Sequence, residues 1–178
     1  MVDEGMDLAA ARKRCWFVDT KGLVVKSRTD LAQHKLRFAH EAPAVGDLMG
    51  AIRAVRPTAL VGVSTMPKAF SKAIVEEMSQ RNERPIIFAL SNPTSKTECT
   101  PEDALRWTGG RAIVATGSPF APVTVNGRRH RIGQCNNAFI FPGVGLGLAI
   151  CQATHVSNGM FLEAAKSLAS SVHEDDLA

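Results

Sequence analysis

Four short apolar runs alternate along the chain with stretches in which apolar residues recur every three or four positions. The runs span residues 14–19, 58–63, 85–90 and 112–115. Between the second run and the third, residues 69–78 place Phe70, Ile74 and Met78 on one side of a helix. Short buried strands separated by helices are typical of parallel βαβ units. The pattern therefore predicts an α/β fold, with an open, mostly parallel sheet and helices on both faces.

Further elements are predicted around these strands. Residues 23–25 are expected to pair with the first run as a hairpin. Thr100 and Pro101 are the residue types of a helix cap and of the first helical position. Asn126-Gly127 between β-branched residues predicts a tight hairpin. Three more helices are expected, over residues 44–55, 136–153 and 161–172.

Polar turns follow the predicted strands. They lie at residues 19–22, 64–66, 91–94 and 117–119. Right-handed crossovers place the carboxyl ends of parallel strands on one edge of a sheet, which is the edge where open α/β sheets bind ligands. The sequence therefore predicts a ligand site at that edge.

The composition is that of an ordinary globular domain, with 178 residues, 45% hydrophobic and 21% charged. No apolar run approaches the ~20 residues that span a bilayer, so we expect no membrane association. The net charge of +4 comes from dispersed basic residues, so we expect no nucleic-acid partner. The four cysteines form no CxxC pair, which is typical of reduced thiols in a soluble intracellular protein.

An acid and a basic cluster follow the first predicted strand. Asp19 stands where the acid of a dinucleotide-binding fold contacts the ribose hydroxyls, although an acid at a strand end is also a common turn residue. Lys35, with Arg28 and Arg37 nearby, has the charge that a ribose 2′-phosphate requires. A solvated basic loop explains the same residues, so both interpretations stay open at this point.

Three asparagines lie at the ends of predicted elements. Asn92 follows the third strand, and Asn136-Asn137 opens an apolar helix. Amide side chains donate hydrogen bonds to carboxylate or carbonyl oxygens without adding charge. Turn formation by Asn92 and helix capping by Asn136 are the alternatives. From these features alone, the chain is a nucleotide-binding type of α/β domain of undetermined chemistry.

Four longer blocks carry a resemblance to a known family. The most extended is NERPIIFALSNPT, at residues 82–94, followed by ECT at 98–100. The others are GRAI with TGSPF (within 110–120), GQCNNA with FPG (within 133–143) and FVDTKGL (17–23). These blocks resemble those of the malic enzymes, in the order of that family and across nearly the whole chain. The resemblance identifies residues 1–178 as a malic-enzyme type of NAD(P)-binding domain with a Rossmann-like fold.

The resemblance implies an activity and a substrate. Malic enzymes oxidise L-malate and decarboxylate the product to pyruvate and CO₂, using NADP or alternatively NAD together with Mg²⁺ or Mn²⁺. It further implies that Asn92 and Asn137 contact the substrate, with Asn136 beside them. Neutral amides suit a dicarboxylate, because they donate hydrogen bonds without introducing a charge.

On the cofactor side, the resemblance implies four residues. Asp19 matches the acid that contacts the ribose. Lys35 matches the position where a lysine accompanies a preference for NADP, since an ammonium group can neutralise a 2′-phosphate. Ser64 and Ser91, at two of the strand-end turns, are also expected to bind the cofactor.

Several parts of the family pattern match nothing in this chain. These parts are the glycine-rich phosphate turn, the metal-binding acids and the tyrosine and lysine that transfer protons; the chain contains no tyrosine. The resemblance therefore implies a domain truncated at both ends and inactive alone, with its metal ion held by residues outside the chain. For the full-length protein we expect a homo-oligomer in the cytoplasm, with an organelle matrix as the alternative compartment.

The segment Thr65-Met66-Pro67 departs from the family, which usually has glycines after that strand. These residues are expected to crowd a cofactor or to reshape the loop. The departure motivates an alternative hypothesis, a non-catalytic α/β interaction or regulatory module derived from the same domain. A third hypothesis is a different nicotinamide-dependent dehydrogenase, against which the blocks at 91–93 and 136–137 argue.

Overall fold

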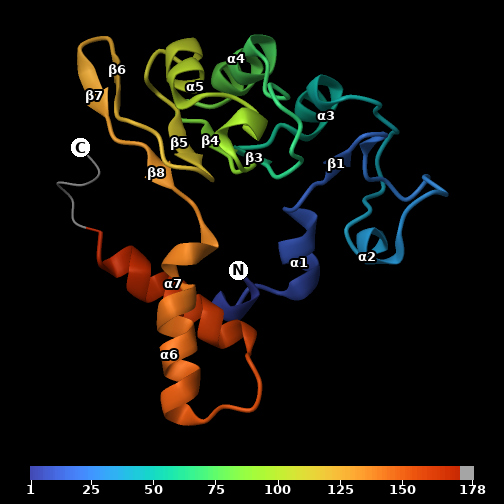
Figure 1. Ribbon diagram of the computed structural model, residues 1–178. Helices are drawn as coiled ribbons and strands as arrows, with labels where there is room; N and C mark the ends of the chain where they lie inside the picture. The colour runs from blue at the N-terminus through green and yellow to red at the C-terminus, as the bar shows by residue number, and fades with distance from the viewer. Residues whose placement is uncertain (173–178) are drawn as a thin grey trace.

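A parallel sheet of four strands forms the centre of the molecule (Figure 1). The computed structural model describes residues 1–172. The strands follow the order β3-β4-β5-β8, with the bounds Ala59–Gly62 (β3), Ile86–Ala89 (β4), Ile113–Thr116 (β5) and Gly133–Gln134 (β8). Every neighbouring pair is parallel, so the prediction of an open parallel α/β sheet is confirmed. The apolar pattern did not predict β8, since its two residues show no periodicity.

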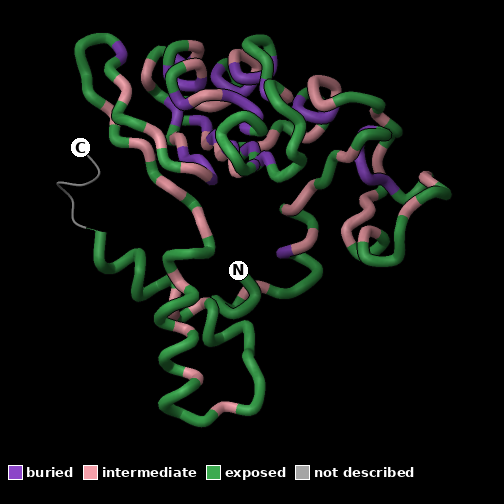
Figure 2. Tube along the Cα trace, in the orientation of Figure 1, coloured by how far each residue is buried: buried purple, intermediate pink, exposed green. Residues whose placement is uncertain are grey.

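Three helices pack against one face of this sheet: α3 (Leu48–Val55), α4 (Lys72–Arg81) and α5 (Pro101–Trp107). Successive side chains of a strand point to opposite faces. Accordingly, Leu60 and Ile87 are buried beneath the helices, whereas Val61 is 52% exposed on the other face. Figure 2 shows the buried positions gathered between the sheet and these helices. The main hydrophobic core therefore lies on this one face.

The helices begin where the sequence supplies caps. The side chain of Asp47 accepts a hydrogen bond from the backbone N–H of Gly50 (2.7 Å) at the start of α3. Thr100 does the same for the N–H of Asp103 (3.1 Å) at the start of α5, with Pro101 in the first helical position. The predicted cap at Thr100 is confirmed, and it satisfies a backbone donor that the helix itself cannot pair.

The hairpin predicted at Asn126-Gly127 is also present. It joins β6 (Val123–Val125) to β7 (Arg128–His130), which pair antiparallel. The φ angles of Asn126 and Gly127 are 51° and 77°. Both are positive, as the tight two-residue turn requires, and asparagine and glycine are the residues that adopt such angles most readily.

The run at 14–19 does not join the parallel sheet, so this part of the prediction is wrong. Only Val18–Asp19 is a strand (β1), and it pairs antiparallel with Gly22–Leu23 (β2), which confirms the expected hairpin. The chain reverses at once because Gly22 adopts a φ of 100° and lies against the carbonyl of Val45, where a Cβ would be 2.1 Å from the oxygen. A tight turn of this kind leaves no residues to extend the strand.

The rest of this N-terminal part is helical or irregular. It contains η1 (Val2–Glu4), α1 (Leu8–Lys13) and α2 (Gln33–Leu36), none of which the apolar pattern predicted. Asp7 caps α1 by accepting a hydrogen bond from the N–H of Ala10 (3.0 Å). Leu23 and Val25 pack with Ala51 of α3 in a second, smaller core, which joins this layer to the sheet domain.

Two C-terminal helices, α6 (Phe141–Cys151) and α7 (Asn158–Ser170), lie on the side of the sheet opposite α3, α4 and α5 (Figure 1). Neither helix contains a buried residue. The predicted helix over 136–153 begins only at Phe141, because a separate short turn, η3 (Asn137–Phe139), precedes it. Lys166 of α7 pairs with Glu4 (2.8 Å). Among residues 1–172, no helix combines the length and apolar character needed to cross a membrane.

Candidate functional site

The carboxyl ends of β3, β4 and β5 lie side by side. Gly62, Ala89 and Thr116, at the ends of these strands, are direct partners in the parallel register. The polar turns that follow them, at 64–66, 91–94 and 117–119, therefore meet at one edge of the sheet. This is the arrangement that the sequence predicted for three of its four polar turns.

Asn92 is oriented by the turn after β5. Its Oδ1 accepts a hydrogen bond from the hydroxyl of Ser118 (2.5 Å). With Oδ1 engaged in this way, the Nδ2 group is the donor that Asn92 can offer to a ligand. Asn92 itself is exposed. Ser118 is a site residue that sequence reasoning missed, and its only signal was its place in the TGSPF block.

Asn136 lies in the same cluster, but both ends of its amide are already engaged. Nδ2 donates to the carbonyl of Gly117 (3.1 Å), and Oδ1 accepts from the N–H of Ala138 (3.0 Å). The capping role considered for Asn136 is therefore present in the structure. The Gln134 side chain donates to the same Gly117 carbonyl (3.3 Å). Together these bonds fasten the end of β8 and the residues that follow it to the turn that orients Asn92.

Asn137 is the first residue of η3 and is exposed. Within the part of the chain that the structure describes, its side chain has no hydrogen-bond partner. Its amide therefore differs from that of Asn136, because it is free to bind a ligand. Asn136 therefore has a structural role, whereas Asn137 offers an available binding group.

Ser64 and Ser91 both donate hydrogen bonds to the carboxylate of Glu98, at 3.3 and 2.5 Å. Ser91 is only 4% exposed, and its hydroxyl also accepts a bond from the N–H of Thr65 (2.9 Å). Ser64 is exposed at the rim of the strand ends. Of the two serines predicted on the cofactor side, the structure therefore places only Ser64 where its side chain is accessible. Glu98 was missed as a site residue.

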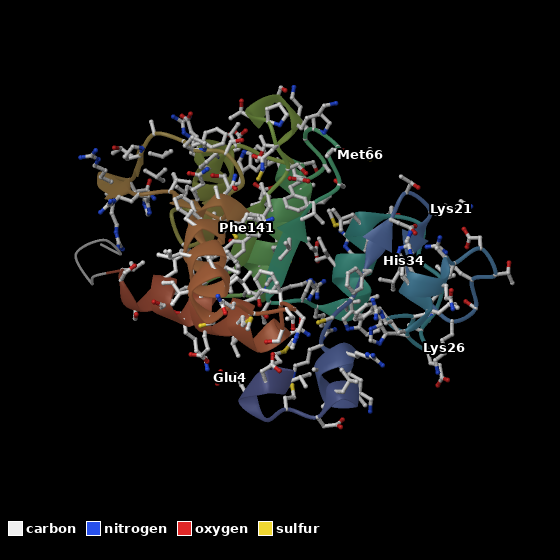
Figure 3. All side chains as sticks on the ribbon, turned by 60° about the horizontal axis from the view of Figure 1, so that its bottom comes forward. Glu4, Lys21, Lys26, His34, Met66 and Phe141 are labelled. Carbon is white, nitrogen blue, oxygen red and sulfur yellow. The ribbon has the colours of Figure 1, made fainter. Side chains whose placement is uncertain are left out.

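The segment Thr65-Met66-Pro67 forms a bent loop after β3. Thr65 has a φ of 57°, in the left-handed region that glycine favours and that a β-branched residue rarely adopts. Met66 is 53% exposed, and Figure 3 shows its side chain at the outside of the loop. The loop thus adopts a glycine-like conformation at Thr65, with the strain that this conformation costs a β-branched residue.

Asp19 and Lys35, the two residues predicted on the ribose side of a cofactor, form an ion pair with 2.5 Å between Oδ2 and Nζ. Arg28 completes the cluster by donating to Asp19 (2.8 Å) and to Asp30 (3.0 Å). Lys21 pairs with Asp30 (2.8 Å) on the outer side. Three cations therefore face two carboxylates, which leaves one positive charge in excess.

Arg28 dominates the electrostatics of this cluster. Its hydrogen bonds hold the pKa of Asp19 well below the ordinary value of 3.8, and bonds from Arg28 and Lys21 do the same for the pKa of Asp30. The two carboxylates in turn raise the pKa of Arg28. Asp19, Asp30 and Arg28 therefore stay charged across the neutral pH range.

A cavity of about 270 Å³ opens beside the cluster. Its apolar wall includes Phe17 and Phe38, whose ring centroids lie 4.8 Å apart, and the guanidinium of Arg37 lies 5.3 Å from the centre of the Phe38 ring. Asp19, His34 and Lys35 supply polar groups. The cavity can therefore accept a flat apolar ring next to an anionic group.

The described residues 1–172 contain no group of three His, Cys, Asp or Glu side chains placed to hold a metal ion. All four cysteines are free. Cys99 is buried, and burial raises the pKa of its thiol to about 12.

An open parallel sheet with amides and hydroxyls at its strand ends, next to a cation-lined cavity, defines a Rossmann-like nucleotide-binding domain. The family described as "Malic enzyme, NAD binding domain" matches this sequence over residues 1–178, and the chain belongs to that family. The resemblance seen in the motif blocks is thereby confirmed.

Individual relatives agree with the family. The chain is 50% identical over 173 residues to a chloroplastic NADP-dependent malic enzyme of Solanum lycopersicum, covering 97% of this chain and 30% of the relative. It is 48% identical over 177 residues to NADP-dependent malic enzyme 2 of Arabidopsis thaliana (99% and 30%), and 47% identical over 178 residues to an NADP-dependent malic enzyme of Anas platyrhynchos (99% and 32%). The chain spans about a third of the length of these relatives.

Proposed function

We propose that this domain binds NADP and L-malate within a longer polypeptide that oxidises malate and decarboxylates the product to pyruvate and CO₂. The observation that carries the proposal is the pair of available amides at the strand-end edge, Nδ2 of Asn92 and the side chain of Asn137. Family membership and the NADP-dependent malic enzymes among the relatives support it. NAD is the alternative cofactor.

The substrate is proposed to lie against these amides. A dicarboxylate needs several donors, and neutral amides supply them without adding a charge next to the nicotinamide. Ser118 holds Asn92 with its donor group free, and Asn136 fixes the Gly117 carbonyl at 3.1 Å. The chain's own residues thus bind and orient the substrate, while the cofactor supplies the acceptor for the hydride.

The cofactor's 2′-phosphate is proposed to bind at Lys35 and Arg28. Asp19 alone would repel a phosphate, but two cations neutralise its carboxylate and leave an excess positive charge in the cluster. The apolar wall of Phe17 and Phe38 is suited to the flat base. Ser64 is proposed to contact the cofactor at the loop after β3. Ser91 is proposed to hold that loop in place by accepting the hydrogen bond from the N–H of Thr65.

Mg²⁺ or Mn²⁺ and the groups that transfer protons are proposed to be supplied by residues outside this chain, as the family resemblance implies. The 178 residues alone are therefore expected not to turn over malate. We further propose that the longer polypeptide forms a homo-oligomer inside the cell, in the cytoplasm or an organelle matrix.

Replacement of Asn137 by alanine in the longer polypeptide separates this proposal from the regulatory alternative. If Asn137 binds malate, the variant should lose at least about tenfold in kcat/KM for malate, because a hydrogen bond to a charged group contributes about 1.5–3 kcal/mol. Asn158→Ala, in the exposed first turn of α7, is the matched control. Equal activity of the two variants would favour a non-catalytic module.

The proposed phosphate contact is tested with Lys35→Gln. This change should raise the KM for NADP by about tenfold or more and leave the KM for NAD within about twofold, since only NADP carries the 2′-phosphate. Lys26→Gln is the control, because Lys26 lies in the same layer and pairs with Glu41 instead (2.7 Å). Figure 3 shows Lys26 and Lys21 in this region. Equal effects on both dinucleotides would place Lys35 outside the phosphate site.

A further inference from the structure

Glu98 is a fully buried carboxylate beneath the candidate site. It follows η2 (Thr94–Lys96), and its exposure is 0%. Its side chain lies against Gly62 at the end of β3, where a Cβ would be 2.5 Å from Cδ of Glu98. Glycine at position 62 thus provides the space that the carboxylate occupies. Burial of an ionised group is costly unless hydrogen bonds compensate for the lost water.

Four hydrogen bonds compensate for this burial, and they come from two different loops. Oε1 accepts from the N–H of Ser64 (3.1 Å), from its hydroxyl (3.3 Å) and from the hydroxyl of Ser91 (2.5 Å). Oε2 accepts from the N–H of Ser91 (3.4 Å). One carboxylate therefore joins the loop after β3 to the loop after β4.

The same network continues to both proposed binding regions. The hydroxyl of Ser91 donates to Glu98 and accepts from the N–H of Thr65 (2.9 Å), which fixes the strained loop proposed to face the cofactor. Ser91 also directly precedes Asn92, whose amide is proposed to bind malate. Displacement of Glu98 would release both loops together.

Only a carboxylate satisfies all of these donors. Glutamine keeps one oxygen, but its NH₂ group would face the N–H of Ser91, and two donors cannot bond to each other. Aspartate keeps the carboxylate but is one methylene shorter, so its oxygens lie too far from Ser64 and Ser91 to accept these hydrogen bonds. Glycine at position 62 offers no side chain to replace the lost contact.

We propose that Glu98 is a positioning residue that sets the cofactor loop and the substrate loop at once, and so determines the affinity for both ligands. The inference rests on the proposed function, because it assigns the two loops to NADP and malate. It goes beyond that function by assigning the geometry of both regions to one buried charge that contacts neither ligand.

The test compares Glu98→Gln with Glu102→Gln in the longer polypeptide. Glu102 lies on α5, its side chain is 54% exposed, and it pairs with Arg106, so it serves as the matched control. The assays are run at a temperature at which the variant is folded. Under these conditions Glu98→Gln should raise the KM for malate and the Kd for NADP by about tenfold each, with a kcat within about twofold of the wild-type value. Glu98→Asp should not restore either value.

A purely structural role predicts a different result. Partial unfolding removes active molecules, so the apparent kcat would fall while the KM for malate and the Kd for NADP stayed unchanged. That pattern would overturn the inference, and so would a rise in only one of the two ligand constants.

A second measurement keeps this inference separate from the proposed function. Hydrogen exchange should become faster at the amides of Ser64, Thr65 and Ser91 together in Glu98→Gln, and not in Glu102→Gln. If the wild-type polypeptide does not oxidise malate, the proposed function fails. The hydrogen-exchange rates alone then test whether Glu98 positions the two loops. Unchanged exchange at these three amides would refute the positioning role whatever the activity.

Discussion

Replacement of Gly117 by alanine perturbs the turn on which both proposed substrate amides depend. A Cβ at this position would lie 2.2 Å from the carbonyl oxygen of Leu90 and 2.8 Å from Nδ2 of Asn92. The φ of Gly117 is not positive, so alanine is compatible with the backbone and the cost is steric. Because ordinary contacts are ~3.5–4.0 Å, the ends of β4 and β5 must separate by roughly 1.3–1.8 Å.

The size of the effect follows from this overlap. Overpacking of this kind destabilises by about 1–3 kcal/mol, or a fall in Tm of roughly 2–4 °C per kcal/mol for a domain of this length. The carbonyl of Gly117 also accepts the bond from Asn136, so the displacement should raise the KM for malate by about tenfold.

Urea unfolding and malate kinetics in the longer polypeptide measure the two effects. Gly46→Ala is the control, because a Cβ there meets nothing within 4 Å and its φ is not positive. If Gly117→Ala unfolded within about 0.5 kcal/mol of the control and kept its KM, the steric reasoning would be refuted.

Three further predictions concern acid stability, loop strain and thiol reactivity. Arg28 lowers the pKa of Asp19 well below its ordinary value of 3.8, so the stability from its ion pairs is fully present above about that pH and is lost progressively as the pH falls toward the lowered value. The difference in unfolding free energy between wild type and Asp19→Asn should therefore shrink steadily from pH 5 to pH 2.5, and a constant difference would contradict this. Thr65→Gly should be neutral or stabilising by up to about 1 kcal/mol in urea unfolding, because it relieves a left-handed φ, and a larger loss would show that the threonine side chain contributes. Iodoacetamide at pH 8.5 should label the exposed Cys135 and leave Cys99, whose pKa is raised to about 12, until the protein is denatured; equal labelling of both in the native state would contradict the burial of Cys99.

Local patterns predicted much of the sheet domain. Thr100 with Pro101 and Asn126 with Gly127 act through short-range hydrogen bonds and φ preferences, so the sequence indicated them directly. The strands β3 and β4 were visible as apolar runs because strands of a buried parallel sheet are rich in apolar residues. The ligand edge followed from the polar turns after these strands.

Features that depend on long-range pairing were not visible. The two-residue β8 exists only through its bonds to β5, and the run at 14–19 failed as a sheet strand because Gly22 reverses the chain against Val45. Asp19 and Lys35 were recognised and lie together, but the orienting roles of Ser118 and Glu98 arise from residues 26 and 7 positions away in sequence. No periodicity in the sequence encodes such contacts.

The most direct test of the proposed function is an assay of the longer polypeptide with L-malate and Mn²⁺, in the presence of NADP or NAD. We predict malate-dependent formation of NADPH and pyruvate in equal amounts, with a lower KM for NADP than for NAD. Absence of malate-dependent reduction of either dinucleotide by the folded wild-type protein would contradict it.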